Sequence, residues 1–133
     1  MAAPYEGGCL CGQVRWRATA EPLNVRVCHC RLCQKATGGP FFARAMFPPD
    51  AFTRSGETTS WPTSERIQRL SCARCGVPMF ATPNDPPPRI AVSIASCDDR
   101  HALKPTVHIW VSEKLDWLAI DDGLPQFERG FPK

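Results

Sequence analysis

Apolar and polar residues alternate along several short segments of the chain. In residues 13–18, Val14, Trp16 and Ala18 alternate with polar or charged residues, which is typical of a strand with one buried face. The same alternation occurs in residues 41–47, 89–96 and 107–111. There it groups Phe41, Ala43, Ala45 and Phe47, then Ile90, Val92 and Ile94, then Val107, Ile109 and Val111. The pattern predicts a strand in each of these four segments.

Turn-forming residues separate these segments and limit the helices. Pro48–Asp50 and Asn84–Pro88 are turn signals, and the fourteen prolines of the chain disfavour long helices. Residues 30–37 suit one short helix, because Gly38 and Gly39 follow them and glycine readily takes the left-handed conformation that ends a helix. We therefore expect a mainly β architecture.

Length and composition are those of an ordinary globular protein. The chain has 133 residues, of which 43% are apolar and 22% charged, so we expect a single domain over residues 1–133. No basic segment followed by an apolar run opens the chain, and no stretch of about 18 apolar residues occurs. We expect a cytoplasmic protein without a membrane partner; a secreted disulfide scaffold is the alternative.

The strongest chemical signal is the spacing of the eight cysteines. Seven of them form the groups Cys9-x-Cys11, Cys28-x-Cys30-x-x-Cys33 and Cys72-x-x-Cys75, and Cys97 stands alone. In a reducing compartment such groups indicate zinc, because cysteines two or three residues apart reach one ion from a tight turn. Gly12 and Gly76 follow two of these turns and allow backbone N–H groups to face the sulfurs.

Seven grouped thiols divide most naturally into a closed site of four and an open site of three, which leaves one zinc position for chemistry. Spacing alone leaves other divisions open, since Cys30, Cys33, Cys72 and Cys75 also form a paired set and a histidine such as His29 is an alternative fourth ligand. Seven thiolates with two zinc ions change the formal charge by −3, which brings +3 to about zero. No basic excess then remains to suggest nucleic acid as a partner.

Four segments carry a resemblance to one family. They are GGCLCGQVRW (residues 7–16), CHCRLCQKATG (28–38), LSCARCGVPMF (70–80) and HIWVSEKLDWLAIDDGLP (108–125). In order and spacing they resemble the glutathione-dependent formaldehyde-activating family, which shares a domain with centromere protein V, and the resemblance extends over residues 7–127. It implies an all-β, Mss4-like fold: a compact β-sandwich of antiparallel strands with zinc knuckles and at most one or two short helices.

The resemblance also implies two zinc ions per chain and a reaction. Cys9, Cys11, Cys72 and Cys75 would hold a structural ion, and Cys28, Cys30 and Cys33 a catalytic ion. The implied activity is that of a carbon–sulfur lyase run in reverse, which forms S-hydroxymethylglutathione from glutathione and formaldehyde; another thiol or aldehyde is the alternative substrate. Cys97 stands at an apolar position of the family pattern and is expected to be buried rather than a ligand.

The remaining site residues are assigned from their chemistry. We expect the substrate thiol to take the open zinc position, because three thiolates weaken the Lewis acidity of the ion and favour a soft sulfur ligand. His29 is expected to point away from the metal, and His108 and Trp110 to share one strand face. The candidates for contact with the carboxylates of a glutathione-like substrate are Arg31, Lys35 and Arg44, and the predicted turn residues are Asp98, Asp99, Asp121 and Asp122.

The alternative function is a zinc-stabilised binding module without catalysis. Such a module needs a basic tail or a large apolar patch for its partner, and the sequence contains no basic tail. We therefore favour an enzyme whose partners are a small-molecule thiol and an aldehyde. The sequence leaves the oligomeric state open.

Overall fold

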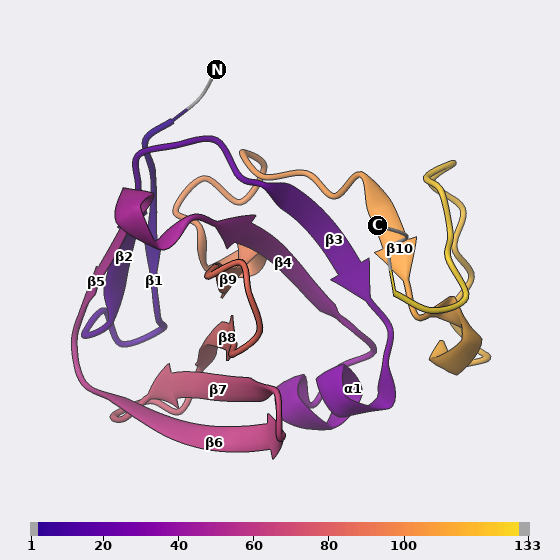
Figure 1. Cartoon of the computed structure of the whole chain (residues 1–133), viewed down its shortest axis with the longest axis horizontal. Helices are drawn as coiled ribbons and strands as arrows, with labels where there is room; N and C mark the ends of the chain where they lie inside the picture. The colour runs from indigo at the N-terminus through magenta and orange to yellow at the C-terminus, as the bar shows by residue number, and fades with distance from the viewer. Residues whose placement is uncertain (1–2, 131–133) are drawn as a thin grey trace.

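The computed structural model describes residues 3–130, and its strands form two β-sheets that enclose a common core (Figure 1). The three-stranded sheet has the order β1 (Tyr5–Gly8), β2 (Arg15–Ala18) and β5 (Phe52–Ser55). The seven-stranded sheet has the order β10 (Val107–Ile109), β3 (Asn24–Cys28), β4 (Phe42–Phe47), β9 (Ile90–Ser93), β8 (Pro78–Pro83), β7 (Ile67–Cys72) and β6 (Thr58–Ser64). The all-β class expected from the sequence is confirmed.

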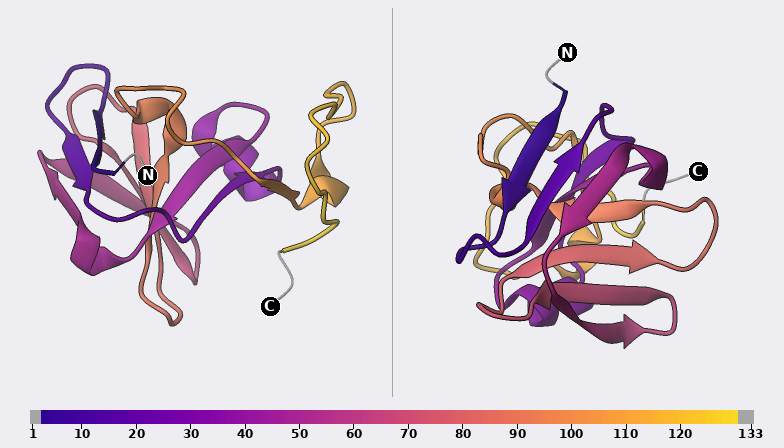
Figure 2. Two further views of the ribbon diagram at one scale, coloured as in Figure 1. Left: turned by 90° about the horizontal axis from the view of Figure 1, so that it is seen from above. Right: turned by 90° about the vertical axis from the view of Figure 1, so that its left-hand side faces the viewer.

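Strand β10 is the exception to the antiparallel pattern. It pairs with β3 in parallel, with Val107 opposite Arg26 and Ile109 opposite Cys28, whereas the other strand pairs are antiparallel. Figures 1 and 2 show the three-stranded sheet at one end of the molecule and the chain that follows β10 at the other. This pairing brings residues from the last quarter of the chain beside Cys28.

The predicted short helix is confirmed as α1 (Arg31–Thr37). It begins at Cys30, whose Sγ accepts a hydrogen bond from the Cys33 N–H at 3.3 Å, and it ends at Gly38, which takes a left-handed φ of 71°. Three-residue 3₁₀ turns follow β4, β9 and β10. No helix among residues 3–130 has the length and apolar character needed to cross a bilayer.

The alternation predicted along β4 divides the apolar residues between two clusters. Ala45 and Phe47 pack with Trp16 of the three-stranded sheet in the core between the sheets. Phe42 and Met46 point to the opposite face, where they pack with apolar residues of β8, β9 and β10. One face of the large sheet therefore stabilises the fold, and the other carries the groups described below.

Two predicted strands end earlier than the alternation suggested. The strand predicted for residues 89–96 ends at Ser93, and that for residues 107–111 ends at Ile109. Trp110 has a left-handed φ of 56°, which interrupts the alternation of side chains. The expectation that His108 and Trp110 share a face was therefore wrong: Trp110 packs with the Phe42 and Met46 cluster, whereas His108 turns toward His29.

Candidate functional site

Four cysteine sulfurs meet at the junction of the two sheets. Cys9 and Cys11 follow β1 of the small sheet, whereas Cys72 ends β7 and Cys75 precedes β8 of the large one. The four Sγ atoms lie within 4.8 Å of one another, with Cys9–Cys11 and Cys11–Cys72 separations of 3.6 and 3.7 Å. Sulfurs about 2.3 Å from a tetrahedral zinc ion are about 3.8 Å apart. The group therefore has the dimensions of a zinc site.

The backbone around this four-cysteine group stabilises thiolates, the form that binds zinc. The Val14 N–H donates to Cys9 Sγ at 3.3 Å. Gly12 and Gly76 adopt the positive φ values, 82° and 77°, that these tight turns require. Burial raises the pKa of Cys9, but the Val14 N–H and the three neighbouring thiols outweigh it and lower this pKa to about 6.

Three further cysteines form a second group beside helix α1. Cys28 ends β3, Cys30 caps α1, and Cys33 lies in the first turn of that helix. Their Sγ atoms lie within 4.8 Å of one another, and within residues 3–130 the group contains no His, Asp or Glu ligand atom. Such a set fits a zinc ion that keeps a fourth position for a substrate. The structure thus brings the seven grouped cysteines together as four and three.

Arg69 of β7 contacts the three-cysteine group and was missed in the sequence. Its Nη2 donates to Cys33 Sγ at 3.2 Å, and its guanidinium lies 5.2 Å from the centre of the Phe42 ring. Hydrogen bonds from Cys28 and Cys30 lower the pKa of Cys33, and Arg69 lowers it further. Arg69 and Ile67 share a face by alternation, but nothing in the sequence relates that face to Cys33, which is 36 residues away.

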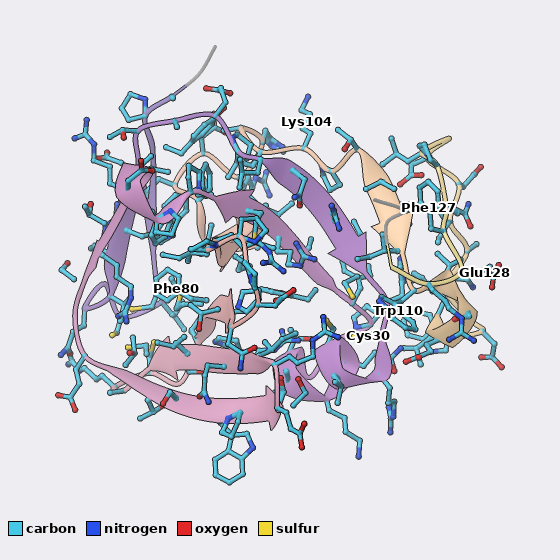
Figure 3. All side chains as sticks on the ribbon, viewed as in Figure 1. Cys30, Phe80, Lys104, Trp110, Phe127 and Glu128 are labelled. Atoms are coloured by element: carbon cyan, nitrogen blue, oxygen red, sulfur yellow. The ribbon has the colours of Figure 1, made fainter. Side chains whose placement is uncertain are left out.

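A cavity of about 400 Å³ opens beside the three-cysteine group. All three cysteines line it, and the rest of its apolar wall is formed by Leu32, Phe42, Met46, Ile67, Ala81, Pro83, Ala91, Ile109 and Trp110. Figure 3 shows Cys30 and Trp110 close together near α1, in keeping with their packing against the same cluster. A small molecule in this cavity would lie next to the sulfurs.

A chain of hydrogen bonds beside the three-cysteine group runs from the buried His29 and His108 to the exposed Asp122. The His29 Nε2 atom is 2.8 Å from His108 Nδ1, and His108 Nε2 is 2.7 Å from Asp122 Oδ2. The hydrogen bond from His108 lowers the pKa of Asp122, so the ionised carboxylate accepts from His108 Nε2–H and His108 Nδ1 then accepts from His29. Burial and the neighbouring His108 lower the pKa of His29 to about 4. His29 is therefore neutral, and its ring lies outside the three-sulfur group.

The other predicted site residues lie in different places. Arg44 lines the cavity, whereas Arg31 and Lys35 are exposed on α1 and are not among the lining residues. Cys97 is 5% exposed in the core between the sheets and belongs to neither cysteine group. Asp122, predicted as a turn residue, accepts from the Leu124 N–H and also contacts His108, a pairing that the sequence analysis did not anticipate.

Fold and cysteine geometry together define a small all-β protein with two cysteine clusters of the size that zinc requires. The family model of the glutathione-dependent formaldehyde-activating enzyme matches residues 4–113. The chain therefore belongs to that family. A Halomonas elongata protein named "Putative glutathione-dependent formaldehyde-activating enzyme" is 31% identical over 129 residues, with 87% of this chain and 80% of that protein covered.

The fold also has a counterpart among solved structures. A crystal structure of a Rhodobacter sphaeroides protein matches with a TM-score of 0.60 and covers 91% of this chain and 98% of its own. The two sequences are 19% identical, so this likeness concerns the fold alone.

Proposed function

We propose that this protein is a zinc-dependent carbon–sulfur lyase that forms or cleaves adducts of a small thiol and an aldehyde, with glutathione and formaldehyde as the type substrates. In the forward direction a sulfur–carbon bond forms, the carbonyl double bond becomes single, and the thiol proton ends on the oxygen. The observation that carries the proposal is a three-sulfur group, without a fourth protein ligand among residues 3–130, that opens onto a cavity.

Each part of the site has a separate task in this reaction. Cys28, Cys30 and Cys33 would hold a zinc ion, which would supply a position at which a thiol becomes more acidic. Arg69 offsets part of the negative charge of the sulfurs through its contact with Cys33. The apolar wall around Phe42 excludes water from the reacting atoms.

The His29–His108–Asp122 chain positions the loop that carries two of the ligands. His29 lies between Cys28 and Cys30, and its ring is held by the buried hydrogen bond to His108. The backbone N–H of His29 donates to the Ile109 carbonyl at 3.0 Å, which connects this loop to β10. A fixed loop keeps the sulfurs at the separations that one ion needs.

The four-cysteine group serves as the structural site in this proposal. A zinc ion there would join the turn after β1 to the turn between β7 and β8, and hence the two sheets. All eight cysteines are free thiols, and thiolate ligands of this kind persist in a reducing compartment. We therefore assign the protein to the cytoplasm.

The proposal is tested by two measurements on one sample of purified protein. Elemental analysis should give two zinc ions per chain, and proton NMR of glutathione with ¹³C-formaldehyde should show adduct exchange faster than in buffer. Cys97→Ala should retain both properties, because Cys97 belongs to neither group. Two ions per chain without faster adduct formation for any thiol would favour the binding module. Disulfides in place of metal would exclude both functions.

A further inference from the structure

Positive charge gathers on the cavity face of the large sheet. Four arginines line the cavity, namely Arg44, Arg66, Arg69 and Arg89. Arg66 and Arg89 lie 3.7 and 3.2 Å from the carboxylate of Asp85, and Arg69 donates to Cys33. Arg44 differs from the other three, because no hydrogen bond or ion pair involves its side chain within residues 3–130.

The surroundings of Arg44 make its position costly. It lies on β4, between β3 and β9 of the large sheet, and its Nη1 is buried without an acceptor among residues 3–130. Directly opposite it on β3 is Arg26, and like charges at opposed positions of a sheet destabilise it. Burial lowers the pKa of Arg44, and the positive charges of Arg26 and Arg69 lower it further. Thiolates at Cys28 and Cys33 raise this pKa, but the net direction is down. A buried donor without an acceptor destabilises a fold, so stability does not explain Arg44.

We infer that Arg44 binds a carboxylate of the substrate thiol, and that the protein therefore selects acidic thiols over neutral ones. This inference rests on the proposed thiol–aldehyde reaction and names the chemical class of the thiol. A carboxylate supplies what Arg44 lacks, a negative charge with two acceptor oxygens that match the planar guanidinium. Arg69 cannot take this role equally well, because its guanidinium is already hydrogen-bonded to Cys33.

The strand register sets the kind of thiol that fits. Phe42 is opposite Cys28 across β3 and β4, and Arg44 lies two residues further along β4. Two residues of a strand span about 7 Å. A thiol whose sulfur lies at the three-cysteine group therefore needs a carboxylate several bonds from that sulfur to reach Arg44. A peptide-sized thiol such as glutathione meets this requirement, and 2-mercaptoethanol does not.

The experiment compares glutathione with its diethyl ester, which keeps the thiol but has no free carboxylate. Adduct formation is measured with the metal-loaded wild type, Arg44→Met and the control Arg17→Met, an exposed arginine on β2 that pairs with Glu6. Wild type and the control should prefer the free acid by about 10- to 100-fold in kcat/KM, the range for a charged hydrogen bond. Arg44→Met should lose this preference, and Arg44→Lys should keep part of it.

Two further measurements separate this role from a structural one. Without ligand, Arg44→Met should melt at a higher temperature than wild type, because it removes a partly buried charge whose Nη1 has no acceptor among residues 3–130. In calorimetry, wild type should bind S-methylglutathione about ten-fold or more tightly than Arg44→Met does.

The outcomes distinguish the inference from the reaction on which it rests. The inference is overturned if Arg44→Met is folded and keeps the wild-type preference, or if it slows acid and ester by the same factor. Failure of the wild type to accelerate either thiol contradicts the proposed reaction instead. Binding of S-methylglutathione still decides the role of Arg44 in that case, and equal binding by wild type and Arg44→Met overturns it.

Discussion

Replacing one cysteine in each group is expected to separate the proposed structural metal site from the proposed functional one. Cys72→Ser removes a thiol of the four-cysteine group, and Cys30→Ser removes a thiol of the three-cysteine group. Serine is a poor ligand for zinc, so Cys30→Ser should retain about one ion per chain where two are proposed for the wild type, and Cys72→Ser should lose the ion proposed for the four-cysteine group. The two variants should nevertheless differ greatly in stability.

The four-cysteine group connects parts of the chain that are far apart. Cys11 and Cys72 are separated by 61 residues, and their sulfurs lie 3.7 Å apart. Structural zinc contributes about 10 to 16 kcal/mol to the folding of small zinc domains, and the whole stability of a domain is about 5 to 15 kcal/mol. If the four-cysteine group holds such an ion, the folding free energy lost with it matches or exceeds the entire stability of the domain. Cys72→Ser should therefore be largely unfolded at 25 °C.

The three-cysteine group is local by comparison. Its members lie between the end of β3 and the first turn of α1, and they do not belong to the core between the sheets. Cys30 also caps α1, and serine is among the residues that cap helices best. Cys30→Ser should therefore stay folded with its melting temperature lowered by a few degrees, and it should have no adduct-forming activity.

Far-ultraviolet circular dichroism, thermal melting and elemental analysis of the same samples check this expectation. The control is Cys97→Ala, which should retain two ions and melt cooperatively, because Cys97 lies in the core and outside both groups. A folded Cys72→Ser protein with a cooperative melt would refute the reasoning about the structural site. An unfolded Cys30→Ser protein would show that the three-cysteine group is needed for folding.

Three other predictions follow from single contacts. Tyr5, the one tyrosine, donates to Glu21 at 2.6 Å, and this bond, with burial, raises its pKa to about 12. Its absorbance should therefore titrate near pH 12 in the folded protein, and a folded-state midpoint near pH 10 would contradict the contact. Because Tyr5 ionises near pH 10 in the unfolded chain, the free energy of unfolding should fall as pH rises from about 10 to about 12. Arg69→Met should weaken zinc retention by the three-cysteine group about 10- to 100-fold in chelator competition, and unchanged retention would exclude a role for the Cys33 contact. Gly56→Ala would place a Cβ against the Gln13 carbonyl oxygen at a residue whose φ is 95°. Urea unfolding should therefore show that the free energy of unfolding falls by about 2 kcal/mol or more. The control Gly39→Ala should change it little, because the nearest atom to its Cβ is 3.7 Å away.

Four strands and the helix could be predicted from the sequence because their causes lie within a few residues, whereas β1, β3, β5, β6, β7 and β8 were not predicted. Gly38 ends α1 as the glycine signal predicts, and the helix is capped by Cys30, the first residue of the predicted segment. The alternation around Trp16 and Phe47 places both side chains in the core between the sheets. The alternation predicted too long a strand at residues 107–111, because Trp110 takes a left-handed backbone conformation. Apolar periodicity does not predict such a conformation.

The candidate site could be predicted only in part from the sequence, because only some of its contacts are between residues close together in the chain. Cysteine spacing of two or three residues is itself a geometric statement about one ion, so the seven ligands could be proposed from the sequence and grouped with the help of the resemblance. Arg69 and Asp122 could not be proposed as site residues from the sequence. Their contacts with Cys33 and His108 depend on how strands and loops are placed in space.

Spacing and periodicity thus established that this is a small β protein with thiols arranged for metal, because those properties arise from neighbours along the chain. The folded arrangement was needed to show that the three-sulfur group faces a cavity and that a buried histidine pair lies beside it. It was also needed to show that Arg44 on the cavity wall has no side-chain partner among residues 3–130. Each of these facts depends on strand order, above all on the parallel pairing of β10 with β3. Strand order is set by the packing of the whole chain, which short-range patterns do not encode.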